Sequence, residues 1–394
     1  MITPVSAHLP TRITGRRPTL PLLIGLRFVA CFAVFLVHIA QDSLFKSPGA
    51  TKDYMSIVAQ GGWLGVSFFF VLSGFVLTWT AHPGETARTF WRRRFVRILP
   101  NHWVTLIITI ALTAWLAHQA IDWGNAAINA GLIQSWFADI MVRTGFNGVT
   151  WTLSCEAFMY VIFPLVFRLI SRIREERLWV WILGTMSTIA AIPCVASLIP
   201  SATTYPGSGL RDWDLYLVMQ IPAMRVFEFM LGILLARFII SGRRLPFGLG
   251  TASALLIGTW AVAGMFPGRF QVLPLAAIPC ALLIGTAARQ DLNGTTPGWA
   301  RGKWVIRLGE LSFAFYMVHR IVIVFGHILL GGGSYSTPVA VGVLLLFAAI
   351  ALLLGWVLMA LVERPLMNKF GARSKPNIRS IEPPRTDDKT PIAA

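Results

Sequence analysis

Long apolar segments alternate with short polar segments along almost the whole chain. Ten of them approach the roughly 20 apolar residues that a helix needs to cross a bilayer. They cover residues 20–41, 62–81, 98–118, 151–171, 178–199, 215–240, 247–266, 271–288, 310–330 and 338–361. The pattern predicts an all-α polytopic bundle of about ten transmembrane helices. A weaker segment, 124–138, is short and carries Asn125, Asn129 and Gln134, so we expect a re-entrant or interfacial helix there.

Lysine and arginine are concentrated in every second connection between these segments. The rich connections hold Arg12–Arg17, Arg88–Arg97, Arg168–Arg177, Arg237–Arg244, Arg289–Arg307 and Arg364–Lys375, whereas the others hold only Lys46, Lys52, Arg143, Arg211 and Arg269. Short cytoplasmic loops of membrane proteins carry such an excess. We therefore expect both termini in the cytoplasm and an even number of spans, which an eleventh span at 124–138 would break.

Composition agrees with a multi-pass protein of the bacterial-type cytoplasmic (inner) membrane. The 394 residues are 55% hydrophobic and only 13% charged, whereas soluble domains average about 25% charged residues. A net charge of +17 would indicate nucleic-acid binding in a soluble protein. Here the basic residues lie in short membrane loops, so the expected partner is the lipid bilayer and not nucleic acid. Nothing in the composition indicates an oligomeric state.

The expected organisation is one transmembrane domain, residues 20–366, between two cytoplasmic tails. The N-terminal tail covers residues 1–19, and the tail at 367–394 is expected to be disordered because it is rich in proline and charge. We expect no cleaved signal peptide, since the first segment is long enough to span and no small-residue cleavage site follows it. The cysteines show no metal-ligand spacing, so we expect small buried apolar residues and no metal site: Cys31, Cys155, Cys194 and Cys280.

Ionisable residues inside the apolar segments are the candidate functional groups, because a charge in hydrocarbon is costly. Arg27 and His38 are eleven residues apart in the first segment, which places them on one helical face about 16 Å apart. Arg27 would lie near the cytoplasmic end and His38 in the outer half. The alternatives are an arginine that extends to the inner interface and a hydrogen-bonded packing histidine.

Glu156 lies near the start of a segment that runs from outside to inside, at an expected depth like that of His38. A carboxylate beside a histidine suits a general base, although an interfacial glutamate facing water is the alternative. Arg94 and Arg97 mark the cytoplasmic start of the third segment. They are either positive-inside anchors or a phosphate clamp for a nucleotide-bearing donor.

Further polar groups complete a track across the membrane. Ser312, Tyr316 and His319 share one helical face near mid-membrane. Arg225 and Glu228 are spaced to form a structural ion pair, and Glu363 closes the last span near the inner arginines. A track of this kind suits group transfer across a membrane, and it suits a secondary transporter of sugars or lipid-linked glycans equally well, although no inverted repeat is visible.

At these residues the sequence resembles the acyltransferase-3 family of integral membrane O-acyltransferases over nearly its whole length. The likeness rests on ordered motifs, which are Arg27 with His38 (Arg-x10-His), Phe69–Phe75 (FFxLSGF), Arg93–Pro100 (RRxxRIxP), Trp151–Glu156 (WSLSxE), Ser312–His319 (SxSxYLxH) and Val362–Pro365 (VERP). Two departures are His102, where the family often has tyrosine, and Ala157, where it often has a second acidic residue. The fused SGNH hydrolase-like domain of some members is not expected here.

The resemblance implies acyl transfer from acyl-CoA, with acetyl-CoA the expected form, as a co-substrate and with no bound cofactor. It implies a carbohydrate or glycosylated small-molecule acceptor, and a catalytic role for His38 as general base or acyl carrier, supported by Glu156. Donor or acceptor contacts would come from Arg27, Arg94, Arg97, Ser73, Ser312, Tyr316 and His319. The acceptor's identity, the length of the acyl chain and the side from which the acceptor enters stay open.

Overall fold

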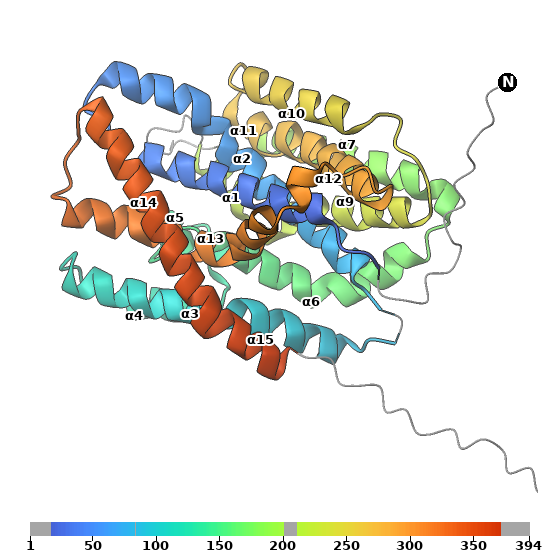
Figure 1. Ribbon diagram of the computed structural model, residues 1–394, viewed down its shortest axis with the longest axis horizontal. Helices are drawn as coiled ribbons and strands as arrows, with labels where there is room; N and C mark the ends of the chain where they lie inside the picture. The colour runs from blue at the N-terminus through green and yellow to red at the C-terminus, as the bar shows by residue number, and fades with distance from the viewer. Residues whose placement is uncertain (1–16, 83, 201–210, 372–394) are drawn as a thin grey trace, which may run out of the picture.

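The chain folds into a bundle of long helices. The computed structural model describes residues 17–82, 84–200 and 211–371. An isolated β-bridge pairs Phe45 with Tyr335. The long helices are α1 (Pro21–Gln41), α2 (Pro48–Trp79), α3 (Ala87–Trp115), α6 (Trp151–Ser171), α7 (Leu178–Ser197), α9 (Pro222–Ile240), α10 (Leu249–Ala263), α12 (Pro274–Leu292), α13 (Lys303–Leu329) and α14 (Thr337–Leu358). Figure 1 shows α1 and α2 in the middle of the bundle and α10 and α14 at its periphery.

Short helical elements connect or extend the long helices. They are α4 (Trp123–Ala130), η1 (Gln134–Trp136), α5 (Ile140–Arg143), η2 (Glu175–Arg177), α8 (Asp212–Asp214), η3 (Leu215–Gln220), α11 (Gly268–Val272), η4 (Gly298–Arg301), η5 (Met359–Glu363) and α15 (Arg364–Phe370). Two of them, η3 and η5, are π-helical turns that adjoin long helices. Ile221, with an extended backbone, separates η3 from α9, which begins at Pro222; the residue before a proline is disfavoured in the helical conformation.

The predicted all-α transmembrane class is confirmed. Each of the predicted spans corresponds to one of the long helices, and 8 helices of the described chain are long and apolar enough to cross a membrane. Helix α9 falls outside that group because it carries Arg225, Glu228 and Arg237, and α10 because it has only 15 residues. The orientation stays a prediction from the loop charges. The expectations for residues 1–16 and 372–394 lie outside the described residues.

Helices α2, α3 and α13 begin earlier than the apolar pattern predicts, and the first two show the reason. Helix α2 begins at Pro48 after the cap residue Ser47, and α3 begins at Ala87 after the cap residue Thr86. Each cap side chain accepts a hydrogen bond from a backbone N–H of the first turn, which is the usual stabilisation of a helix start. Hydropathy missed these turns because they are polar. In consequence the arginines of 88–97 lie on a helix and have fixed directions.

The chain between α3 and α6 is a folded segment, residues 116–150, and not an additional span. Helix α4 has 8 residues and would be only about 12 Å long, which agrees with the expectation that 124–138 does not cross the membrane. Buried side chains attach this segment to the start of α6. Gln134 donates to the carbonyl of Thr150 at 3.0 Å, and Ser135 donates to that of Trp151 at 2.8 Å.

Helices α2 and α9 cross in direct backbone contact. A Cβ atom at Gly74 would lie 2.0 Å from the carbonyl oxygen of Phe229, and one at Gly232 would lie 1.9 Å from that of Val71. Only glycine allows these distances. Small residues at helix crossings are a general device of membrane proteins, where packing and not hydrophobicity drives helix association.

Helix α1 is held between α2 and α13 in the same way. A Cβ atom at Gly65 of α2 would lie 2.7 Å from the carbonyl oxygen of Ala30, and one at Gly309 of α13 would lie 2.0 Å from that of Ile24. The backbones of α2 and α13 therefore touch α1 on its two sides. This contact fixes the direction of every side chain on α1, including Arg27 and His38.

The predicted pair of Arg225 and Glu228 is present and fully buried. Arg225 Nη1 lies 3.2 Å from Glu228 Oε2, and the guanidinium carbon lies 4.8 Å from the centre of the Phe70 ring. Removing one partner from such a pair leaves a buried charge uncompensated. We assign this pair a structural role.

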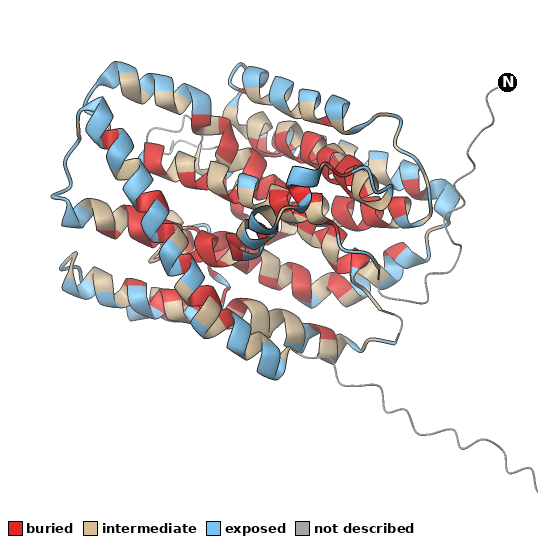
Figure 2. Cartoon of the chain, in the orientation of Figure 1, coloured by how far each residue is buried: buried red, intermediate tan, exposed pale blue. Residues whose placement is uncertain are grey.

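Apolar side chains cover much of the outer surface of the bundle. Figure 2 shows buried residues concentrated on the central helices and exposed residues on the peripheral ones. Leu345, Leu353 and Trp356 of α14 are between 55% and 61% exposed, as expected for side chains that face lipid. Cys194 is exposed as well, so the expectation of burial was wrong for this cysteine, whose position on α7 faces out of the bundle.

We predict that Gly232→Val prevents correct packing of α2 against α9. The added side chain meets the backbone of Val71, which cannot move aside alone, so the destabilisation should reach at least about 3 kcal/mol. Gly258→Val is the matched control, because no atom lies within 4 Å of a Cβ atom added there. Thermal unfolding and monodispersity in detergent measure the effect. Equal stability of the two variants would contradict the crossing described here.

Candidate functional site

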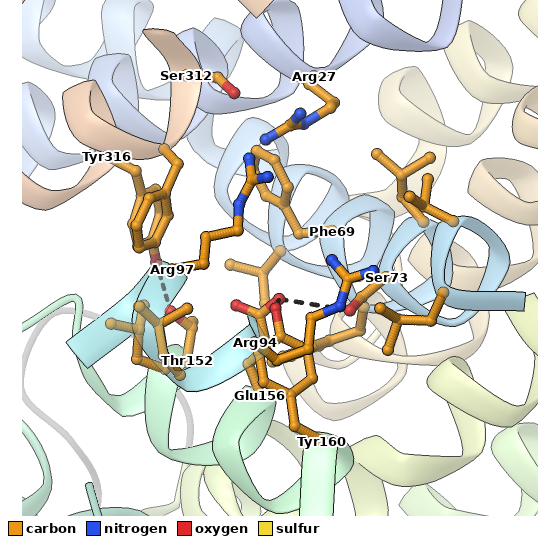
Figure 3. Close-up of a pocket in the computed structure, with 18 residues that line it drawn as sticks. Arg27, Phe69, Ser73, Arg94, Arg97, Thr152, Glu156, Tyr160, Ser312 and Tyr316 are labelled. Carbon is orange, nitrogen blue, oxygen red and sulfur yellow. Dashed lines mark hydrogen bonds between the residues drawn. The ribbon is translucent and has the colours of Figure 1, made fainter. Parts of the chain in front are cut away.

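A polar cavity lies between α1, α2, α3, α6 and α13. Its empty volume is about 950 Å³, which includes space open to solvent. The lining residues are Arg27, Val66, Phe69, Phe70, Leu72, Ser73, Val76, Leu77, Arg94, Arg97, Ile98, Thr152, Leu153, Glu156, Tyr160, Ser312, Phe313 and Tyr316. Figure 3 shows the polar members converging from different helices. The predicted inner arginines, Ser73, Glu156, Ser312 and Tyr316 are thus brought together.

Arg94 and Arg97 enter the cavity because α3 begins eleven residues before the apolar segment that predicted it. They are three positions apart, so they share a helical face. Arg94 donates to the hydroxyl of Thr80 at 3.3 Å, and its buried Nε atom has no hydrogen-bond partner among the described residues. Arg97 lies 3.9 Å from the carboxylate of Glu363, the pairing foreseen for that glutamate.

Arg27 and Arg97 point toward each other across the cavity (Figure 3). Arg27 forms no hydrogen bond or ion pair with another described residue, and its nearest electrostatic neighbours include Arg97, Glu363 and Glu156. Two guanidinium groups that face the same space repel each other, and an anion between them would relieve that repulsion. Three arginines against one carboxylate among the lining residues give this cavity an excess of positive charge, which suits an anionic ligand.

Glu156 belongs to this cavity and does not pair with His38. Its carboxylate accepts a hydrogen bond from the Tyr160 hydroxyl at 2.5 Å and another from the Ser73 hydroxyl at 3.4 Å. The expected His38–Glu156 pair is not formed, because Glu156 faces the cavity that the arginines line. The 116–150 segment bonds to the start of α6, and Trp151 to Cys155, which precede Glu156, are all buried.

The outer end of the cavity is formed by Phe69, Tyr316 and Thr152. The hydroxyls of Tyr316 and Thr152 lie 3.0 Å apart, and the rings of Phe69 and Tyr316 have centroids 6.1 Å apart. Ser312 also lines the cavity, but its hydroxyl donates to the carbonyl of Gly309 at 2.8 Å. The hydroxyl hydrogen of Ser312 is therefore already bonded within α13.

His38 and His319 form a pair one helical turn beyond this end. His38 Nδ1 lies 2.9 Å from His319 Nε2, and His319 Nδ1 lies 2.7 Å from the carbonyl oxygen of Tyr316. His319 is fully buried, whereas His38 is partly exposed. Neither lines the cavity, although the rings of Tyr316 and His319 are only 5.4 Å apart at their centroids. The candidate residues thus form two adjoining groups in place of one track.

A charged pair lies directly outside the histidines. Arg320 forms an ion pair with Asp42 and donates to the carbonyl of His38 at 3.4 Å. Asp42 was not among the candidate residues from the sequence. It follows His38 by one helical turn, at the end of α1, and this spacing could have indicated a place beside the histidine. Tyr160 was missed as well, and it follows Glu156 by the same interval on α6.

Three comparisons with known proteins bear on this site. A family model described as an acyltransferase domain, Acyl_transf_3, matches residues 21–360. The chain is 37% identical to "Acyltransferase MdmB" of Streptomyces mycarofaciens over 94% of this chain and 96% of that protein. It is 24% identical to "Peptidoglycan O-acetyltransferase OatA" of Listeria monocytogenes over 50% of this chain, and 22% identical to "Putative peptidoglycan O-acetyltransferase YrhL" of Bacillus subtilis over 77%. These matches span 33% and 49% of the two relatives' lengths. No solved structure matches.

We predict that the thiol introduced by Ser73→Cys reacts faster with a negatively charged thiol reagent than with a positively charged one. The lining arginines should raise the ratio of the two rates about tenfold over that of a free thiol. The background is Cys194→Ser, since the other native cysteines are buried.

Ser67→Cys is the matched control on the same helix, because Ser67 is fully buried and does not line the cavity. It should not react. Adding Arg94→Gln to Ser73→Cys should reduce the charge preference. Equal rates of the two reagents with the Ser73→Cys variant would contradict an electropositive cavity.

Proposed function

This chain belongs to the Acyl_transf_3 family and is an acyltransferase, and we propose that it moves an acyl group from acyl-CoA to a hydroxyl of a carbohydrate or glycosylated metabolite. Acetyl is the expected acyl group. The bacterial cytoplasmic membrane is the proposed location, because the chain is a multi-pass membrane protein whose relatives include the proteins of Streptomyces and Listeria named above, which are bacteria.

The observation that carries the donor assignment is the set of arginines with open donor groups in one cavity. Arg27 has no protein partner among the described residues, and Arg94 keeps an unused Nε–H. Guanidinium groups match phosphate oxygens in shape and charge. The diphosphate of CoA supplies such oxygens on a chain long enough to pass through the cavity. By the predicted orientation, these arginines lie toward the cytoplasm, where CoA is found.

The length of the cavity suits the pantetheine arm of CoA. Its walls run along α2 from Leu77 to Val66, a distance of about 16 Å on a helix. The guanidinium groups of Arg27, Arg94 and Arg97 line part of the cavity. Its outer end is lined by the aromatic rings of Phe69 and Tyr316. An acyl-pantetheine chain that follows the path brings its thioester to Tyr316, one turn from His319.

His38 is the proposed catalytic residue because it is the partly exposed member of the histidine pair. Its Nε2 atom has no hydrogen-bond partner among the described residues. As a general base, Nε2 takes the proton of the acceptor hydroxyl while that oxygen attacks the thioester carbonyl. The tetrahedral intermediate then breaks its C–S bond, and the CoA thiolate leaves and receives the proton from His38. As an acyl carrier, the same nitrogen would attack the thioester first and pass the acyl group on.

Carbohydrate acceptors are proposed because two relatives carry the name of peptidoglycan O-acetyltransferases. The acceptor would approach the partly exposed side of His38, opposite the arginines. Asp42 and Arg320 border that approach. A transporter would leave its solute chemically unchanged, so formation of an acylated product separates the two functions.

We predict that His38→Ala lowers the rate of acyl transfer by about 10² to 10⁴-fold, the range for loss of a general base. The assay is transfer of labelled acetyl from acetyl-CoA to a glycan acceptor by purified protein in nanodiscs. His118→Asn is the control, because His118 is exposed, far along the chain from the site, and has a positive φ of 51° that asparagine tolerates. Undiminished transfer by His38→Ala would refute the assignment.

We predict that Arg94→Ala and Arg97→Ala raise the KM for acyl-CoA about 10- to 100-fold and change kcat far less. Each removes hydrogen bonds to a charged ligand, worth about 1.5–3 kcal/mol. Arg88→Ala is the matched control, since Arg88 is exposed in the first turn of the same helix. If the KM for acyl-CoA stayed at the wild-type value, both arginines would be interface anchors only.

A further inference from the structure

The hydrogen bonds of the histidine pair fix which nitrogen carries each proton. His319 Nδ1 lies 2.7 Å from the carbonyl oxygen of Tyr316. A carbonyl oxygen only accepts hydrogen bonds, so His319 carries a proton on Nδ1. This bond lies within one helix and spans three residues, which makes it a local and rigid constraint on the ring.

His319 is neutral, and its second nitrogen is therefore an acceptor. The ring is fully buried and stacks on Phe315 with an interplanar angle of 9°. Its other described neighbours are the rings of Phe35, Tyr316 and His38, and none is a carboxylate. The adjacent Arg320 directs its charge to Asp42. A second proton on His319 would place an uncompensated cation in this apolar position.

The tautomer of His38 follows from that of His319. A neutral histidine protonated on Nδ1 has its lone pair on Nε2, and this atom lies 2.9 Å from His38 Nδ1. His38 must then donate from Nδ1, which leaves the lone pair of His38 on Nε2. This is the nitrogen without a protein partner, on the partly exposed side of the pair.

We infer that His319 is a positioning residue that holds His38 in its Nδ1–H tautomer, with Nε2 free to act on substrate. The inference rests on the proposed role of His38. It assigns His319 a place different from the substrate contact expected from sequence, because His319 is fully buried and does not line the cavity. The backbone carbonyl of Tyr316, through His319, performs the orienting task that a carboxylate performs for catalytic histidines elsewhere.

The same bond supports the charged state that forms during transfer. When His38 Nε2 takes the proton of the acceptor hydroxyl, its ring becomes an imidazolium with N–H groups on both nitrogens. The Nδ1–H bond to His319 then has a charged donor, and such bonds are about twice as strong as neutral ones. The proton returns from Nε2 to the departing thiolate, and both histidines end in their starting tautomers.

Two substitutions separate this role from simple packing. His319→Phe keeps an aromatic ring among Phe35 and Phe315 but removes the acceptor. His319→Gln keeps an acceptor oxygen and an N–H donor on a side chain of similar reach. We expect His319→Phe to lower kcat about 100-fold with the KM of both substrates within about threefold of wild type. His319→Gln should retain kcat within about fivefold.

His327→Phe is the matched control on the same helix, because His327 lies in the last turn of α13 and its ring bonds to the carbonyl of Gly333. It should keep wild-type kinetics. A kcat of His319→Phe within about threefold of wild type overturns the inference. So does equal loss of kcat in folded His319→Phe and His319→Gln, since a retained acceptor would then be without effect.

The tautomer itself is measured without turnover. The ¹⁵N chemical shifts of histidine-labelled protein in nanodiscs distinguish Nδ1–H from Nε2–H, and the spectrum of His38→Ala identifies the His38 signals. We expect Nδ1–H at His38 in the wild type and a mixture of tautomers in His319→Phe. An Nε2–H tautomer in the wild type overturns the inference. Active His38→Ala would instead refute the proposed catalytic role and leave this measurement valid for the pairing.

Discussion

The direct backbone contact of α1 with its two neighbours determines the geometry of the site. Gly65 on α2 and Gly309 on α13 leave no room for a Cβ atom against the carbonyls of α1, so α1 can neither rotate nor slide without separating the three helices. Packing contacts of this kind replace the hydrophobic driving force that is missing between helices in lipid. Because α1 is fixed, Arg27 faces the cavity from one side while His38, three turns further, meets His319 of α13.

The contacts of the buried charges distinguish structural from functional groups better than their burial does. Arg225 with Glu228, and Arg320 with Asp42, are charges whose partners come from the protein. Arg27 has no such partner among the described residues, and Arg94 has an unused donor, although both lie where an unpaired charge is costly. A folded chain keeps such groups at low cost only if water or an anionic ligand reaches them, and the cavity between α1 and α3 provides that access.

The sequence predicted the helices and the inner group of arginines, but not the division of the site into two parts. Apolar length identified the spans, because lipid imposes that length directly. The expected pair of Glu156 with His38 was wrong, because the carboxylate of Glu156 bonds to Tyr160 and Ser73 inside the cavity. The 116–150 segment covers the start of α6 through the bonds of Gln134 and Ser135, and no pattern in the sequence reveals such a cover. The His38–His319 pair could not be read either, since it joins residues 281 positions apart.

The two parts of the site are connected by α1 and α13, and this connection sets the distance between donor binding and chemistry. Arg27 and His38 are eleven residues apart on one helix, about 16 Å along its axis. Tyr316, at the end of the cavity, and His319, which orients His38, are three residues apart on the other. Neither distance depends on a loop. A donor held by its phosphates at Arg27 therefore reaches the histidine pair only if its arm has the matching length, whatever acyl group it carries. The fixed spacing on α1 and α13 would thus select a donor with an arm of the length of pantetheine. The residues around Phe69 and Tyr316 would select the acyl group, and the residues on the opposite side of His38 would select the acceptor.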